Sequence, residues 1–183
     1  MKDIIPQILD LWALILSICI ALYLLLSVVQ FLVKKPIGFY QSINRFLANN
    51  YVIIWLLATF LAVSGSLFYS DVMWYEPCKL CWYQRIFMYS QFVLFVIALF
   101  VKNKVLVINS LVLSTIGILI STYHYLIQTG IIRTWSCSIA GDYTASCSDY
   151  FVMAYGYITI PVMAFIIFAL VIIAGIAHKR LGK

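Results

Sequence analysis

Residues 78–101 read CKLCWYQRIFMYSQFVLFVIALFV, a pair of cysteines followed by a long apolar run. The basic stretch 102–104 (KNK) ends this run. A membrane-spanning helix needs about 20 predominantly apolar residues. We therefore predict that the stretch forms a transmembrane helix, with its two cysteines at one edge of the bilayer.

Four further apolar runs flank this one, two on each side, at residues 11–33, 51–69, 105–128 and 155–177. The chain is 65% hydrophobic and 10% charged, whereas soluble domains have roughly 45–50% and about 25% of these residues. A soluble core of 183 residues could not enclose so much apolar surface. Because lipid leaves no water to satisfy the backbone, we predict an all-α, polytopic membrane helical bundle.

The first apolar run, at residues 11–33, is expected to be a retained helix and not a signal peptide. It is about twice as long as the usual h-region of roughly 7–15 residues. No A-x-A cleavage pattern follows it.

The charged residues predict how the helices are oriented. The connections at residues 34–50, 102–104 and 178–183 carry only basic charges, and all six acidic residues lie on the opposite side of the predicted spans. Cytoplasmic loops of membrane proteins carry an excess of Lys and Arg, so the N-terminus should lie outside and the C-terminus in the cytoplasm. The net charge of +6 reflects this asymmetry, and we do not interpret it as a nucleic-acid signal.

Cys78 and Cys81 stand at the start of the third predicted helix. Pro77 suits the first helical position, and the positive end of the helix dipole favours a thiolate there. The three-residue spacing puts both sulfurs on one face, with Arg85 a further turn along the same stripe. A charge at that depth in a membrane is costly, so we expect Arg85 to pair with or contact something functional.

The other cysteines divide into a loop pair and a single residue. Cys137 and Cys147 lie in the only long polar connection, at about residues 129–154. With the orientation predicted above, they and the C-x-x-C pair face the extracytoplasmic side, where disulfides persist. We favour redox chemistry, with a static disulfide or a four-cysteine zinc site as alternatives. Cys19 lies within the first run and is expected to be a small buried apolar residue.

Several motifs closely resemble those of the DsbB family of disulfide-generating membrane proteins, and within it the BdbC-like branch. They are PCKLCWYQRI at 77–86, GSLFYS at 65–70, YHYLIQ at 123–128 and ITIP at 158–161. The resemblance covers about residues 50–178. The C-x-x-C precedes the loop pair, which is the reverse of the order in the related vitamin K epoxide reductase fold.

The resemblance implies a DsbB-like four-helix redox domain at residues 48–183. Residues 1–47 would then form an additional N-terminal transmembrane helix and its cytoplasmic connection. This helix departs from the four-helix family pattern.

The resemblance also implies an activity, a cofactor and a partner. The family oxidises a thioredoxin-like, DsbA-like dithiol oxidase outside the cytoplasm and passes two electrons to a membrane quinone, ubiquinone or menaquinone. We therefore expect a thiol–quinone oxidoreductase in a bacterial plasma membrane. Because the quinone is hydrophobic and dissolves in the bilayer, the C-x-x-C belongs at the membrane edge.

Carried over residue by residue, the resemblance assigns roles to the cysteines. The loop pair, Cys137 with Cys147, should meet the partner, whose thiol most naturally attacks Cys137. Electrons then pass to Cys78 with Cys81, and Cys81 delivers them to the quinone. Arg85 matches the quinone-site arginine of the family, where it would stabilise negative charge.

His124 lies about one turn from the outer end of the fourth run, at a depth comparable with Arg85. We expect it to contact the quinone, with a histidine satisfied by a tyrosine or a backbone carbonyl as the alternative. The alternative for the whole chain is a membrane scaffold with structural disulfides or a zinc site. Replacing Cys81 by Ser should separate the two, since only the oxidase needs this thiol.

Overall fold

A computed structural model describes residues 4–34, 37–101, 104–132 and 146–181 of the chain. The described residues form five long helices and a π-helical turn: α1 Ile4–Val33, α2 Gly38–Leu67, η1 Phe68–Val72, α3 Lys79–Phe100, α4 Lys104–Gln128 and α5 Ile160–Leu181. All five helices are long and apolar enough to cross a membrane. The predicted all-α membrane bundle is therefore confirmed.

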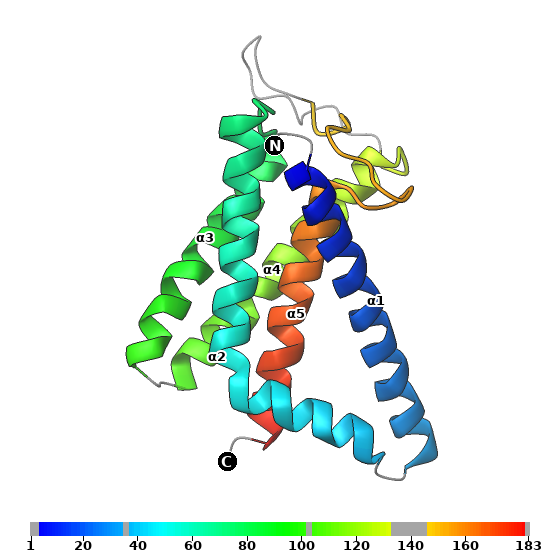
Figure 1. Ribbon diagram of the computed structural model, residues 1–183, viewed down its shortest axis with the longest axis vertical. Coiled ribbons are helices and arrows are strands. Elements are labelled where there is room, and N and C mark those ends of the chain that lie inside the picture. Colours follow the sequence, from blue (N-terminus) through cyan, green and yellow to red (C-terminus); the bar gives the residue numbers. More distant parts are fainter. Residues whose placement is uncertain (1–3, 35–36, 102–103, 133–145, 182–183) are drawn as a thin grey trace.

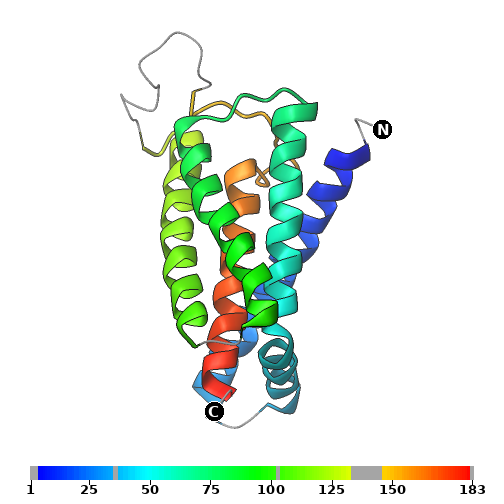
Figure 2. The ribbon, with the colours of Figure 1, turned by 90° about the vertical axis from the view of Figure 1, so that its left-hand side faces the viewer.

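Helices α2 to α5 pack into a bundle, and α1 leans against one side of it (Figure 1). Figure 2 shows the same arrangement from the side. The connection between α2 and α3 lies at the same end of the bundle as the start of α1, and the C-terminus lies at the opposite end. The α1 helix is near the bundle at its N-terminal end and diverges from it towards its C-terminal end (Figure 1). Cys78, Cys81 and Cys147 lie at the end where α1 is close.

The start of α2 differs from the prediction. We expected a span at residues 51–69 after a connection at 34–50, but the helix already begins at Gly38. This first part of α2 crosses beneath the other helices before the helix turns along the bundle (Figures 1 and 2). The first part of α2 is hydrogen-bonded to α1: the Tyr23 hydroxyl donates to Oδ1 of Asn44 at 2.9 Å. The boundary expected between residues 47 and 48 falls inside α2 and stays a prediction.

The start of α5 also differs from the predicted span at residues 155–177. The helix begins at Ile160 because the preceding residues form a tight turn, with an isolated bridge between Ala154 and Ile158. Tyr155 and Gly156 in this turn both have positive φ angles, which no helix accommodates. The helix therefore starts several residues later than hydropathy alone suggests.

The core of the bundle depends on close approach of helices at small residues. A Cβ atom added to Gly117 on α4 would lie 2.4 Å from the Phe168 ring on α5. Trp55 on α2 is 1% exposed, and its Nε1 donates to the Val171 carbonyl of α5 at 2.9 Å. Interlocked contacts of this kind hold α2, α4 and α5 in one arrangement, which fixes the positions of the side chains at the cysteine end.

Candidate redox site

Cys78 caps the N-terminus of α3. Its backbone is extended, and its sulfur accepts the backbone N–H of Cys81 at 3.3 Å. We had predicted that the helix begins at Pro77, but it begins at Lys79. The reason is that the Cys78 sulfur satisfies one of the free N–H groups of the first turn. Cys78 and Cys81 are not bridged to each other, and their sulfurs lie 2.9 Å apart.

The surroundings of Cys78 favour the thiolate form of its side chain. Its side chain is 1% exposed. The hydrogen bond with the Cys81 thiol, reinforced by His124, lowers the pKa of Cys78 to about 5, although burial opposes this. A thiolate is the nucleophile in thiol–disulfide exchange, so the lowered pKa makes Cys78 the candidate nucleophile of the pair.

His124 on α4 supports this thiolate directly. Its ring is 2% exposed, and Nε2 lies 3.6 Å from the Cys78 sulfur. Nδ1 lies 3.3 Å from Nε2 of the buried Gln84 side chain. When the Gln84 amide donates to Nδ1, the ring carries its proton on Nε2, which faces the sulfur. Gln84 thus orients the histidine so that it can donate to Cys78.

Cys147 joins this cluster from the segment before α5. Its side chain is fully buried, and its sulfur, the Cys78 sulfur and a ring nitrogen of His124 all lie within 4.8 Å of one another. Cys147 is disulfide-bonded. A free Cys78 thiolate beside a disulfide sulfur is the arrangement that exchange requires. Cys137, the other predicted loop cysteine, lies outside the described residues.

The segment after Cys147 is tied to the end of α4. The Gln128 side-chain amide donates to the Asp149 carbonyl at 2.9 Å. The Tyr150 hydroxyl donates to the Gln128 carbonyl. These bonds hold the chain that carries Cys147 over the end of the helix that carries His124.

The same cluster has the residue types of a metal site, which bears on the zinc alternative. Two cysteines and a histidine can provide three zinc ligands. Zinc needs deprotonated thiols, and the Cys147 sulfur is part of a disulfide. The zinc alternative therefore requires that the disulfide of Cys147 be reduced.

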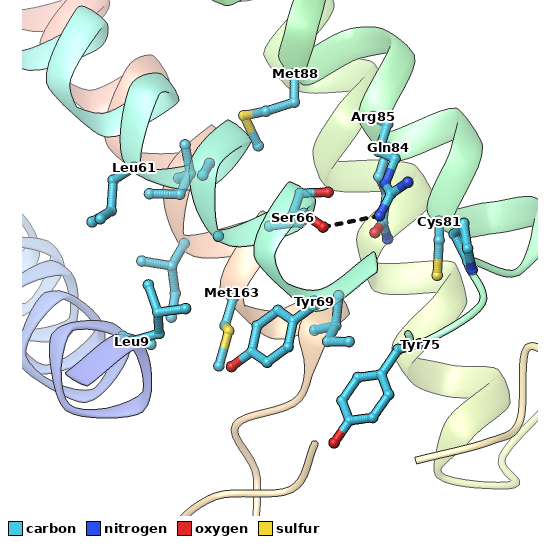
Figure 3. A pocket seen from close by; sticks show the side chains of 18 of the residues that line it. Leu9, Leu61, Ser66, Tyr69, Tyr75, Cys81, Gln84, Arg85, Met88 and Met163 are labelled. Atoms are coloured by element: carbon cyan, nitrogen blue, oxygen red, sulfur yellow. Dashed lines mark hydrogen bonds between the residues drawn. The ribbon is translucent and has the colours of Figure 1, made fainter. Parts of the chain in front are cut away.

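Arg85 lies next to Cys81 at a cavity of about 130 Å³ within the bundle, and both line it. Its guanidinium donates to the Ser66 carbonyl of α2 at 3.1 Å and lies 5.3 Å from the centroid of the Trp82 ring. Figure 3 shows Cys81 and Arg85 on the same side of the cavity. We expected Arg85 to have a partner, and the structure provides one, the backbone carbonyl of Ser66. The charge of Arg85 lies next to the cavity.

Most of the cavity wall is apolar, and it ends in a stack of aromatic rings. The Tyr69 and Tyr75 rings are stacked with centroids 6.0 Å apart, and Tyr75 stacks in turn on Phe151 at 5.1 Å. Among the described residues, the buried Tyr69 hydroxyl finds no hydrogen-bond partner. Apolar walls with a few convergent polar groups are typical of small-molecule sites. A flat, apolar ring that carries polar oxygens would be complementary to these groups.

The structure separates two residues that we predicted to share the cofactor. Arg85 lines the cavity, whereas His124 contacts Cys78 and is not among the cavity-lining residues. A cofactor contact for His124 stays a prediction. A second expectation is wrong: Cys19 is exposed on the outer face of α1, where a chain in a membrane meets lipid.

Sequence reasoning missed several residues of the site. Gln84 follows Cys81 by one turn, a spacing that could have marked it as a neighbour of the pair. Ser66 and Tyr69 lie within the motif at 65–70, but nothing in the sequence shows that they meet Arg85 or a cavity. The contribution of α1 to the cavity wall was not expected at all.

The sequence of this chain is similar to those of known proteins. Residues 48–178 match the family model "Disulfide bond formation protein DsbB". A probable disulfide formation protein of Oceanobacillus iheyensis is 41% identical over 134 residues, which cover 73% of this chain and 90% of that protein. The SPbeta prophage-derived disulfide bond formation protein B of Bacillus subtilis is 36% identical over 140 residues, or 76% of this chain and 90% of the relative. No solved structure shows significant similarity to the chain.

Proposed function

The chain belongs to the DsbB family of disulfide bond formation proteins, and on that premise we propose that it is a membrane thiol–quinone oxidoreductase. It reoxidises the dithiol of an extracytoplasmic, thioredoxin-like (DsbA-like) oxidase and passes the electrons to a membrane quinone. One observation carries the proposal. Cys78 lies beside the disulfide-bonded Cys147, while Cys81 lines an apolar cavity together with Arg85.

The first step takes place at the loop pair. A thiolate of the partner attacks Cys137 of a Cys137–Cys147 disulfide, and Cys147 leaves as a thiolate. The second partner thiol then attacks the mixed disulfide, which releases the oxidised partner and leaves both loop cysteines reduced. The two electrons and two protons of the partner dithiol now reside on Cys137 and Cys147.

The second step moves these electrons to the C-x-x-C. The Cys147 thiolate attacks Cys78 of a Cys78–Cys81 disulfide, and Cys81 leaves. Cys137 then attacks Cys147, which restores the loop disulfide and releases Cys78. Cys78 is a good leaving group because its pKa is held at about 5. In the product of this step Cys147 is again disulfide-bonded, and Cys78 and Cys81 are free thiols.

The third step regenerates the Cys78–Cys81 disulfide. When bound in the cavity, a quinone supplies the oxidising chemistry, since it takes up two electrons and two protons. The Cys81 thiol faces the cavity and Arg85 holds a fixed positive charge beside it, where developing negative charge is stabilised. His124 and Gln84 keep Cys78 as a thiolate that can close the disulfide as Cys81 reacts.

The proposed orientation puts this chemistry on the extracytoplasmic side. The basic connections then face the cytoplasm, and the end of the bundle that carries the cysteines faces outward. The N-terminus and the connection between α2 and α3 lie at the same end, which is consistent with that orientation (Figure 2).

A donor-to-quinone assay tests the proposal. The detergent-purified full chain receives a reduced thioredoxin-like dithiol and either ubiquinone-1 or menadione, and the absorbance of the oxidised quinone is followed. We expect one partner disulfide for each quinone reduced, no turnover in Cys81→Ser, and normal turnover in Cys19→Ser, which changes an exposed cysteine on α1. An unchanged absorbance with a competent donor would overturn the proposal. Equal activity of the Cys81→Ser variant would favour a scaffold.

A further inference from the structure

The N-terminal helix α1 lies outside the region that matches the family. The family model begins at residue 48, whereas α1 spans Ile4–Val33. One stripe of this helix nevertheless lines the cavity that holds Cys81 and Arg85, through Leu9, Trp12, Ala13 and Leu16. The helix therefore contributes a wall to the site that the family resemblance does not account for.

The contact between α1 and the cavity is one-sided. Ala13 on the cavity stripe is 7% exposed, whereas Leu11 and Ile15 on other faces are 49% and 43% exposed. Leu9 also fits against Gly65 of α2, where an added Cβ would lie 3.5 Å from its methyl groups. Trp12 on the same stripe is 50% exposed, so the close contact of α1 is centred on Leu9 and Ala13, and it gives the helix a defined rotation against the bundle.

Two buried polar atoms without partners lie at this junction. Among the described residues, neither the Tyr69 hydroxyl nor Oδ1 of Asp10 forms a hydrogen bond. Tyr69 is 6% exposed and lines the cavity, and Asp10 follows the lining residue Leu9 on α1. Leaving a buried donor unpaired is costly, and native proteins rarely do so without a functional reason.

The Tyr69 hydroxyl and Arg85 lie at different parts of the cavity. In Figure 3, Arg85 and Cys81 are on one side, and the Tyr69 hydroxyl points away from Cys81 towards Met163 and Leu9. The cavity thus has a cationic end next to the reactive thiol and a hydroxyl donor near α1, with apolar walls between them. A quinone has the complementary pattern, because its two carbonyl oxygens lie on opposite edges of a flat apolar ring.

We propose that α1 completes the acceptor site: its Leu9–Leu16 stripe closes the cavity, and the Tyr69 hydroxyl donates a hydrogen bond to the quinone oxygen that lies away from Cys81. This inference rests on the proposed function and deepens it. It makes the additional helix a determinant of quinone affinity. Tyr69 and Leu9 act by binding the quinone ring and do not take part in thiol exchange.

Equilibrium binding tests this role separately from turnover. Ubiquinone-1 and menadione are titrated onto the full chain in detergent with the C-x-x-C oxidised, and the dissociation constant is obtained from quenching of tryptophan fluorescence. We expect Tyr69→Phe to weaken binding of the better probe about threefold to tenfold, as loss of one hydrogen bond does. The matched control, Tyr123→Phe on α4, removes a hydroxyl from a ring that is 42% exposed and should bind as the wild type does.

A second pair of variants tests the wall itself. Leu9→Ala removes side-chain volume from the cavity stripe, and Leu11→Ala makes the same change on the lipid-facing side of the same helix. We expect weaker quinone binding only in Leu9→Ala. Tyr69→Phe removes a hydroxyl without a described partner, so the melting temperature of the quinone-free protein should not fall.

The outcomes distinguish this inference from the proposed function. If the wild type reduces quinone, and Tyr69→Phe and Leu9→Ala bind both probes as the wild type does, the role of α1 is wrong and the oxidase stands. If the wild type neither binds nor reduces either probe, the proposed function fails and the inference fails with it. The melting temperature of each variant shows whether it is folded. If Leu9→Ala unfolds, the binding constant of Tyr69→Phe decides the outcome.

Discussion

Nε2 of His124 lies 3.6 Å from the sulfur of Cys78, and the opposite ring nitrogen of the same histidine lies 3.3 Å from the Gln84 amide. Gln84 lies on α3, His124 lies on α4, Cys78 caps the start of α3, and all three are buried. This chain of contacts links the orientation of the histidine to the charge state of the reactive cysteine. The two thiols of the C-x-x-C therefore have different surroundings: Cys78 contacts His124, and Cys81 lines the cavity.

The first prediction concerns the cause of the low pKa of Cys78. The hydrogen bond with Cys81 is the largest contribution and His124 is a smaller one, so Cys81→Ala should raise the pKa of Cys78 from about 5 more than His124→Phe does. Cys81→Ser keeps a donor at the same place and should retain part of the lowering. The pH dependence of Cys78 alkylation, read by mass spectrometry of the peptide, measures this. Equal midpoints in all variants would contradict the account.

The second prediction is the pH dependence of stability with the C-x-x-C reduced. The pKa of Cys78 is lowered on folding from an ordinary value of about 8.5. The resulting stabilisation is fully present above about pH 8.5 and is lost as the pH falls through about 5. The melting temperature of the reduced protein should therefore fall over this window on acidification. Cys78→Ala should show a smaller fall, and an identical profile would refute the linkage.

The third prediction traps the exchange between the two cysteine pairs. Cys81→Ala removes the resolving thiol, and at a pH above the raised pKa of Cys78 the Cys78 thiolate can still attack the neighbouring Cys147 sulfur. We expect a Cys78–Cys147 cross-link to accumulate, detected as a linked peptide by mass spectrometry. In Cys78→Ala, where the remaining thiol is Cys81, the corresponding link should be rare. Equal amounts of both links would show that the described proximity does not direct the exchange.

The fourth prediction separates thiol exchange from electron transfer to the acceptor. Arg85→Met removes the positive charge next to Cys81, and we expect the oxidation of the C-x-x-C by quinone to slow by about 10-fold or more. Arg85→Lys should recover part of this rate, since it restores the charge without the planar donor group. Exchange between the loop pair and the C-x-x-C, measured without quinone, should stay unchanged. Equal slowing of both steps would indicate a general structural defect.

The fifth prediction tests the packing that supports the site. In Gly117→Ala, the new methyl group would lie 2.4 Å from the Phe168 ring, so α4 and α5 must move apart. We expect a loss of roughly 1–3 kcal/mol in unfolding free energy. Gly38→Ala is the control, because nothing lies within 4 Å of its added Cβ. Thermal unfolding in detergent compares the two, and equal melting temperatures would show that this contact is not tight.

The membrane bundle could be predicted from the sequence because it depends on a property that one sequence carries, the length of each apolar run. The ends of the helices were less predictable. Gly38 begins α2 far ahead of the apolar run, because a helix can continue outside lipid where hydropathy gives no signal. Ile160 begins α5 late because the turn at Tyr155 and Gly156 is built from residues as apolar as the helix itself.

The site divides in a similar way. The sequence could place Cys78, Cys81 and Arg85 together, because residues three or four positions apart lie on the same face of a helix. It could not predict the contact of Cys78 with His124, since this contact depends on how α3 and α4 are rotated against each other. The same holds for Leu9 on α1, whose place at the cavity depends on docking between helices far apart in sequence.

A single-turnover reaction without the partner tests the central claim most directly. The full chain with Cys78 and Cys81 reduced and the Cys147 disulfide intact is mixed with ubiquinone-1 or menadione, and the free thiols and the quinone absorbance are followed together. The account predicts that two thiols disappear for each quinone reduced, that they belong to Cys78 and Cys81, and that the reaction slows in Arg85→Met. Thiols that persist in the presence of either quinone, in protein that is folded, would contradict it.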